Sequence, residues 1–174
     1  MSSVNQTIAS PVRPSGAFML RHPAHLLALG FGSGLSPVAP GTVGTLLGWL
    51  MFNVLALRVP HFLAPPVLLT VIGVSFLVGV VACHVTGRGL GVQDHGAIVW
   101  DEIVAIWLVL AVAPTGWSWQ CAGVVLFRVF DIWKPAPIGR LELRFKNGFG
   151  TMADDMVAAA YALLVLAIIR SLTA

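Results

Sequence analysis

The chain has 174 residues, of which 57% are hydrophobic and only 10% are charged, and its formal net charge is +3. A soluble domain carries charge on about a quarter of its residues, so this composition indicates a protein of the lipid bilayer. The net charge is too small, and the chain too apolar, to suggest a nucleic-acid partner. The length predicts a single membrane domain over residues 21–174, which follows a flexible segment over residues 1–20 without a signal-peptide pattern.

Long stretches without Lys, Arg, Asp or Glu mark the expected membrane helices. A crossing helix needs about 20 residues, with about 17 as the lower limit. In chain order, we expect apolar helices over residues 43–57, 65–84, 97–113, 118–133 and 152–170. The first is short enough to be re-entrant, whereas the second and third are expected to cross fully. The sequence therefore predicts an all-α, polytopic membrane protein with four to five apolar helices.

Basic residues concentrate in the connections on one side of the predicted helices. Five crossings would place residues 30–42, 85–97 and 134–151 on this side, and the loops 58–64 and 114–117 on the other. The first side would hold Arg13, Arg21, Arg88, Lys134, Arg140, Arg144 and Lys146, and the second Arg58 and Arg170. Because cytoplasmic connections carry an excess of Lys and Arg, the first side is predicted to be cytoplasmic.

Six of the seven acidic residues fall at helix ends on this same side. They are Asp94, Asp101 and Glu102 before and in the third predicted helix, Asp131 at the end of the fourth, and Asp154 and Asp155 at the start of the fifth. Clustered carboxylates in a lipid-embedded protein require cations, and hard oxygen ligands suit Mg²⁺, which binds one or two carboxylates together with water and substrate phosphate. We therefore expect an Mg²⁺ site at the cytoplasmic interface, with Glu102, Asp131, Asp154 and Asp155 as ligands.

Each acid also has a purely structural explanation. Carboxylates in a first helical turn are favoured by the helix dipole by about 0.3–1 kcal/mol, and Thr151 with Asp154 fits a capping box. Asp131 could form a plain ion pair with Arg128 or Lys134, which flank it at three-residue spacing. It lies near a helix C-terminus, however, where negative charge is disfavoured. An ion pair explains one acid and not six.

The stretch "GFGSGLSPVAPGTVGTLLG", residues 30–48, brings glycines and small hydroxyl residues to the start of the first long helix. Exposed backbone N–H groups at a helix N-terminus attract anions, although small residues also permit close helix packing in membranes. The candidate phosphate-binding residues are Ser36, Gly41, Thr42, Gly44 and Thr45, together with the cations Arg128 and Lys134. Asp94 and His95 are further candidates, and a lone histidine near an interface is more often structural.

Four blocks of the sequence together resemble one known family. "GFGSGLSPVAPGTVGT", "DHGAIVWDE", "FRVFDIWKPAP" and "NGFGTMADDMVA" are similar, in order and spacing, to the signature blocks of the phosphatidylglycerophosphatase A family, over roughly residues 22–170. The resemblance implies an Mg²⁺-dependent phosphatase of the bacterial inner membrane that converts phosphatidylglycerophosphate to phosphatidylglycerol and phosphate in phospholipid biosynthesis. The family commonly has glycine where Ala105 and Ala159 stand here, a small-for-small change at expected packing faces.

On this interpretation the catalytic residues are Asp101, Glu102, Asp131, Arg128 and Lys134. One carboxylate would act as base or nucleophile, and the two cations would offset charge in the transition state. Two alternatives belong to other classes. A cation transporter also uses intramembrane acids, but acids on one side leave no polar path to the other. A metal-dependent lipid-headgroup transferase usually carries a D-G-x-x-A-R run, which is absent from this chain.

Overall fold

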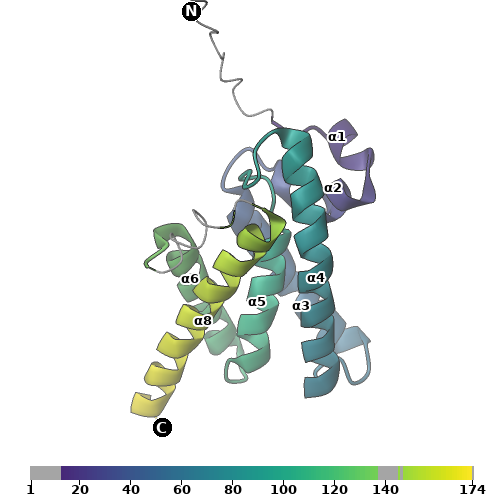
Figure 1. Ribbon diagram of the computed structural model, residues 1–174. Helices are drawn as coiled ribbons and strands as arrows, with labels where there is room; N and C mark the ends of the chain where they lie inside the picture. The colour runs from purple at the N-terminus through teal and green to yellow at the C-terminus, as the bar shows by residue number, and fades with distance from the viewer. Residues whose placement is uncertain (1–12, 137–144, 146, 174) are drawn as a thin grey trace, which may run out of the picture.

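The computed structural model describes residues 13–136, 145 and 147–173, and within them all regular structure is helical. Figure 1 shows the order of the elements. They are α1 (Gly16–Leu20), α2 (Pro23–Ala28), the 3₁₀ helix η1 (Gly30–Leu35), α3 (Pro40–Arg58), α4 (Pro65–Leu90), α5 (Trp100–Val112), α6 (Trp117–Trp133) and α8 (Gly148–Thr173). The predicted all-α fold is confirmed. Of the segment expected to be flexible, residues 1–12 lie outside the described residues, and α1 occupies its last part.

The five longer helices form a bundle with α5 at its centre. Helices α3, α5 and α8 begin at one end of the bundle, where α4 and α6 end (Figure 1). Helix α5 contacts each of the other four, and its residues from Trp100 to Leu110 are buried with the exception of Leu108. A helix that is apolar on all sides is stable only when other elements surround it. The expected packing positions Ala105 and Ala159 are both fully buried.

Within the described residues, three helices are long and apolar enough to cross a membrane, namely α3, α4 and α8. The expected number of four to five was therefore slightly high. The expectation was wrong for the third predicted helix, because α5 has only 13 residues and at 1.5 Å per residue is about 20 Å long. Helix α5 begins later than predicted because the backbone N–H of Val99 donates to the carbonyl of Ala28, 2.9 Å away. Val99 thereby connects the end of α2 to the N-terminus of α5.

The first predicted helix, by contrast, is longer than expected. Helix α3 has 19 residues and starts at Pro40, because proline at the first helical position loses no hydrogen bond and already has a helical φ. Glycine lets α3 approach α5 closely: a Cβ on Gly48 would lie 3.0 Å from the Ile103 Cα. The indole Nε1 of Trp107 also donates to the Gly48 carbonyl at 2.8 Å. This face of α3 is built for helix packing.

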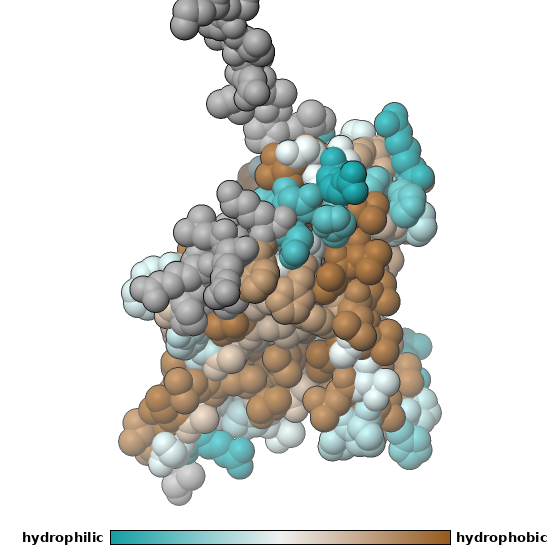
Figure 2. Space-filling model, in the orientation of Figure 1, coloured by the Kyte–Doolittle hydropathy of each residue, from teal (hydrophilic) through white to brown (hydrophobic). Residues whose placement is uncertain are grey.

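The outer surface of the bundle is strongly apolar. Figure 2 shows a broad hydrophobic band across the middle of the visible face, with hydrophilic residues above and below it. Large exposed side chains on four helices contribute to this surface, among them Leu50, Leu77, Val125 and Leu164. Exposed apolar area of this extent is not tolerated in water by monomeric proteins. The fold thus has the exterior of a membrane protein.

Candidate active site

Three carboxylates meet where the N-terminal ends of α5 and α8 lie together. Asp101 and Glu102 belong to the first turn of α5, and Asp155 lies in the second turn of α8. Each is buried, and one oxygen of each lies within 4.8 Å of the others. We refer to Asp101, Glu102 and Asp155 as the carboxylate trio.

The trio is short of hydrogen-bond partners. Asp101 Oδ1, Glu102 Oε2 and Asp155 Oδ2 are buried and accept no hydrogen bond. Buried polar atoms are almost always paired, and a buried carboxylate without a cation is costly. Three neighbouring carboxylates that each keep an orphaned oxygen offer the hard oxygen ligands that Mg²⁺ prefers. The trio could therefore hold a divalent cation.

Asp155 is placed by the start of α8, which lies one turn earlier than expected. The side chain of Asn147 accepts hydrogen bonds from the backbone N–H groups of Phe149 and Gly150, each at 3.1 Å. The predicted capping box was therefore wrong, because Thr151 and Asp154 lie inside the helix. Asparagine directly before a helical segment is a recognised N-cap, so the sequence did contain the correct signal.

Asp131 and Asp154 each lie within hydrogen-bond distance of a basic side chain, and we call them the paired aspartates. Within the described part of the chain, only Glu102 of the trio contacts a basic side chain, at the longer distance of 3.5 Å from Arg128. Arg128 donates to Asp131 three residues along α6, which confirms the ion pair considered from the sequence. Lys134 Nζ lies 2.9 Å from Asp154 Oδ2 and 3.9 Å from Asp94 Oδ2. Lys134 reaches them from the end of α6, where its backbone adopts a left-handed conformation with φ 44°. These pairs leave the metal-binding capacity chiefly with the trio.

Arg128 links Asp131 to the trio. Its Nη1 lies 3.5 Å from Glu102 Oε1, while its Nε is buried and has no partner. Gly41 of α3 lies directly against this contact between Arg128 and Glu102. A Cβ on Gly41 would overlap Glu102 Oε1 and lie 3.1 Å from both terminal nitrogens of Arg128. A larger residue at this position would push apart the Glu102 and Arg128 side chains, and Arg128 retains one unused N–H donor beside the carboxylates.

The other predicted phosphate-binding residues fall into different environments. Thr42 lies beside Arg128 in the wall of an open groove. Gly44 instead packs against Val99, and the buried Thr45 hydroxyl donates to the Gly41 carbonyl at 2.9 Å. The structure therefore places Gly44 and Thr45 in the contact between α3 and α5.

Ser36 and His95 line a separate cavity of about 260 Å³, together with Arg13. The Ser36 hydroxyl donates to the Val38 carbonyl at 2.8 Å. His95 Nδ1 accepts the backbone N–H of Ala97 at 3.1 Å, in keeping with a structural histidine. Burial lowers the pKa of His95, against the opposing effect of the Asp94 charge. The neutral imidazole is thereby favoured, so His95 is a poor cation for a phosphate group.

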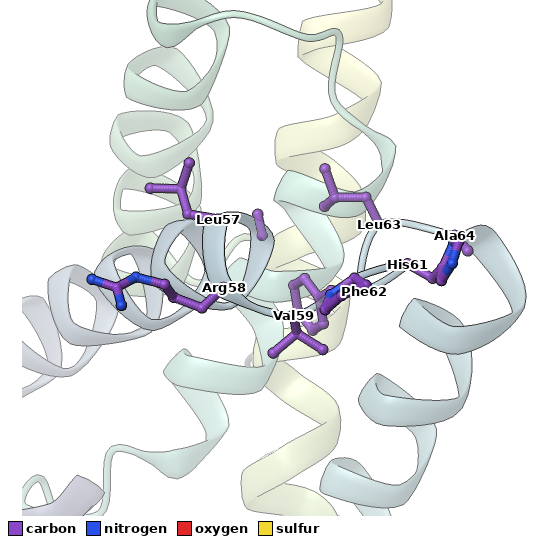
Figure 3. A pocket seen from close by; sticks show the side chains of 9 residues that line it. Leu57, Arg58, Val59, His61, Phe62, Leu63 and Ala64 are labelled. Carbon is purple, nitrogen blue, oxygen red and sulfur yellow. The ribbon is translucent and has the colours of Figure 1, made fainter.

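The opposite end of the bundle has no comparable chemistry. A pocket there is lined by residues 56–64, and Figure 3 shows Arg58 and His61 among its side chains. No acidic residue lines it. The described carboxylates thus gather at one end only, as the positions in the sequence predicted. Three of the basic residues expected at that end, Arg140, Arg144 and Lys146, lie outside the described residues.

A buried carboxylate trio beside an arginine, in a helical bundle with an apolar exterior, is the arrangement of a membrane-type protein with a polar site at one end. The sequence profile of the phosphatidylglycerophosphatase A family matches residues 26–170. The chain belongs to this family, and it is an enzyme of the phosphatase class. The family resemblance of the four sequence blocks is thereby confirmed.

Named relatives cover most of the chain. A phosphatidylglycerophosphatase A of Haemophilus influenzae is 44% identical over 88% of this chain and 92% of its own length. The protein of the same name in Escherichia coli is 43% identical over 80% and 78%. A protein of Bacteroides thetaiotaomicron, provisionally named as a phosphatidylinositol-3-phosphatase, is 34% identical over 83% and 92%. No solved structure matches the chain.

Proposed function

We propose that the protein hydrolyses the phosphomonoester of phosphatidylglycerophosphate, yielding phosphatidylglycerol and inorganic phosphate, with Mg²⁺ as cofactor. The substrate is inferred from the names of two relatives that are more than 40% identical to the chain. The observation that carries the chemistry is the group of orphaned oxygens of Asp101, Glu102 and Asp155 beside the unpartnered Nε of Arg128. Such a site offers ligands for a cation and a donor for a phosphate oxygen in adjacent positions.

In this mechanism the trio would hold the metal ion. When bound, Mg²⁺ supplies a Lewis acid that withdraws electron density from the phosphoryl group. Arg128 donates to a phosphate oxygen and is held in place by Asp131 and Glu102. Lys134, anchored by Asp154, adds a second positive charge near the phosphoryl group. A carboxylate of the site acts either as the base that takes the proton from the attacking water or as the nucleophile. In both cases the P–O ester bond breaks and the phosphatidylglycerol oxygen leaves and takes up a proton; a phosphorylated carboxylate would then be hydrolysed by water.

The proposal is tested by measuring phosphate release from lipid phosphomonoesters in mixed micelles. The panel contains phosphatidylglycerophosphate, phosphatidic acid and phosphatidylinositol 3-phosphate, each with Mg²⁺, with EDTA, and with Mg²⁺ restored after EDTA. We expect the fastest release from phosphatidylglycerophosphate, its loss in EDTA and its recovery with Mg²⁺. Full activity in excess EDTA would contradict the metal, and preference for another lipid would contradict the substrate.

We further propose that the protein acts in phospholipid biosynthesis in the bacterial inner membrane, with its site facing the cytoplasm. The excess of Arg and Lys at the acidic end supports this orientation. Gly96 and Thr115 are exposed at the two ends of the bundle, and a Cβ on Gly96 meets open space. In a background without Cys83 and Cys121, Gly96→Cys should resist an impermeant thiol reagent in intact cells, whereas Thr115→Cys should react. The reverse labelling pattern would contradict the orientation.

A further inference from the structure

An open groove of about 750 Å³ runs along the outside of the bundle where α3 and α6 lie side by side. Its apolar wall consists of Val124, Val125, Val129, Ile132 and Trp133, all from α6. Ile132 and Trp133 are 72% and 71% exposed, so they face outward and not into the core. The volume falls in the range of about 300–1,000 Å³ that small-molecule sites occupy.

The polar part of the groove is formed by Thr42 and Arg128. Among the described residues, Arg128 is the only charged one that lines the groove, and its side chain also forms ion pairs with Glu102 and Asp131. The groove and the carboxylate trio therefore share one guanidinium group. Its Nε, buried and unpartnered, is a donor without a protein acceptor at the point where the apolar wall meets the acidic site.

The groove opens toward the hydrophobic surroundings of the bundle. Its wall belongs to α6, and the neighbouring helix α3 is one of the candidate membrane spans. Leu46 and Leu50 of α3 and Val125 of α6 are also exposed, so the surface next to the groove is apolar. A molecule that enters here must have an apolar body, and a negatively charged end is required to match Arg128. Phospholipids combine these two properties.

We propose that this groove binds the lipid part of the substrate, with an acyl chain along the α6 wall and an anionic group of the headgroup at Arg128 and Thr42. The substrate would enter sideways from the bilayer between α3 and α6, and its phosphate would reach the trio without leaving the membrane surface. This inference rests on the proposed lipid phosphatase function and adds the path and the binding surface for the lipid.

The first experiment narrows the groove from its outer side. Val129 is 47% exposed, so Val129→Trp can be accommodated without disturbing the core. Val74 of α4 is similarly exposed, at 55%, and Val74→Trp provides the matched control away from the groove. With dioleoyl phosphatidylglycerophosphate, Val129→Trp should raise KM about tenfold with little change in kcat, the pattern for loss of uniform substrate binding. A water-soluble dibutanoyl analogue should be hydrolysed equally by both variants.

The second experiment has a readout independent of turnover. Phosphatidylglycerophosphate with a photoreactive diazirine in one acyl chain is irradiated with the Asp155→Asn variant in nanodiscs, and the labelled peptides are identified by mass spectrometry. Labelling should concentrate on residues 124–133 and decrease when unlabelled substrate is added. Uniform labelling of all outer helices would overturn the proposal. A separate variant, Val125→Cys, tests whether the groove is instead an interface between two copies of the chain, and disulfide crosslinks between copies would also overturn the proposal.

The two proposals fail in different ways. If the wild-type protein releases no phosphate from any lipid while residues 124–133 are still labelled, the proposed function is wrong and the lipid groove remains. If the wild-type protein is active and Val129→Trp behaves like Val74→Trp, the groove is wrong and the proposed function remains.

Discussion

The carboxylate trio and the paired aspartates lie at the same end of the bundle, yet their surroundings differ. Asp131 and Asp154 each contact a basic side chain from α6. Asp101, Glu102 and Asp155 share the single, longer contact from Arg128 to Glu102, and each keeps an orphaned oxygen. Five neighbouring acids are therefore not equivalent. The paired aspartates position cations, whereas the trio is left with capacity for a cation that the chain does not supply.

Helix geometry accounts for part of this difference. Asp101 and Glu102 lie in the first turn of α5, where the partial positive charge of the helix N-terminus favours carboxylates. Asp155 lies one turn further into α8, where this effect is weaker. Asp131 lies near the C-terminus of α6, where the dipole has the opposite sign, and it needs Arg128 for compensation. We use four substitutions or titrations to test whether the two groups act differently.

The largest effect is expected from Asp155→Asn. This change removes a proposed metal ligand of the trio, so kcat/KM should fall by more than the roughly 10–100-fold that loss of a ligand-supporting residue costs. The melting temperature should remain equal or rise, because a buried carboxylate with an orphaned oxygen is lost. Kinetics and thermal unfolding of the same preparation provide the measurement. Normal turnover would remove Asp155 from the metal site.

A smaller loss is expected from Asp131→Asn. The substitution keeps the shape of the side chain but weakens its hold on Arg128, so kcat/KM should fall by about 10–100-fold. Asp131→Glu, which retains the charge, serves as the comparison and should recover part of the activity. Equal activity of Asp131→Asn and the wild type would reduce this aspartate to a structural ion pair.

Asp154→Asn should affect stability more than catalysis. Removing one partner of a buried ion pair costs about 3–5 kcal/mol, and the cost here should be lower because the Lys134 side chain is 29% exposed. The Asn side chain can still accept the backbone N–H of Asp155, as Asp154 Oδ1 does at 3.1 Å. Activity should change by less than for Asp131→Asn. A loss equal to that of Asp155→Asn would place Asp154 among the metal ligands.

The smallest effect is expected from a Mg²⁺ titration of thermal stability. An ion that binds only the folded state stabilises it by about 2.7 kcal/mol at one hundred times its dissociation constant, so Mg²⁺ should raise the melting temperature of the wild type by several degrees. Asp155→Asn should show little increase, whereas Asp154→Asn should respond like the wild type. Equal shifts in all three proteins would indicate ion binding elsewhere.

Much of the fold could be predicted from the spacing of charges. Apolar stretches bounded by charged residues and prolines marked the positions of all five long helices, although α4 ends at Leu90 and not at residue 84, and α8 begins at Gly148 and not at residue 152. The alternation of the connections predicted that the acids gather at one end. The late start of α5 could not be predicted, because Val99 is apolar and fits a helix, and its removal from the helix depends on a hydrogen bond to Ala28, distant in the chain.

The family, the helical class and the set of acidic and basic residues at the site could be predicted from the chain alone, because they depend on residue types and their order. Which acids lie close to a basic side chain depends on the packing of the helices. The predicted metal ligands included Asp131 and Asp154, which in the structure pair with Arg128 and Lys134. The prediction placed Asp101 among the catalytic residues only, whereas in the structure Asp101 lies beside Glu102 and Asp155. Lys134 reaches Asp154 from a left-handed backbone position, and Gly41 lies close to the contact between Glu102 and Arg128. Both result from how three helices pack together, and neither leaves a periodic pattern in the chain.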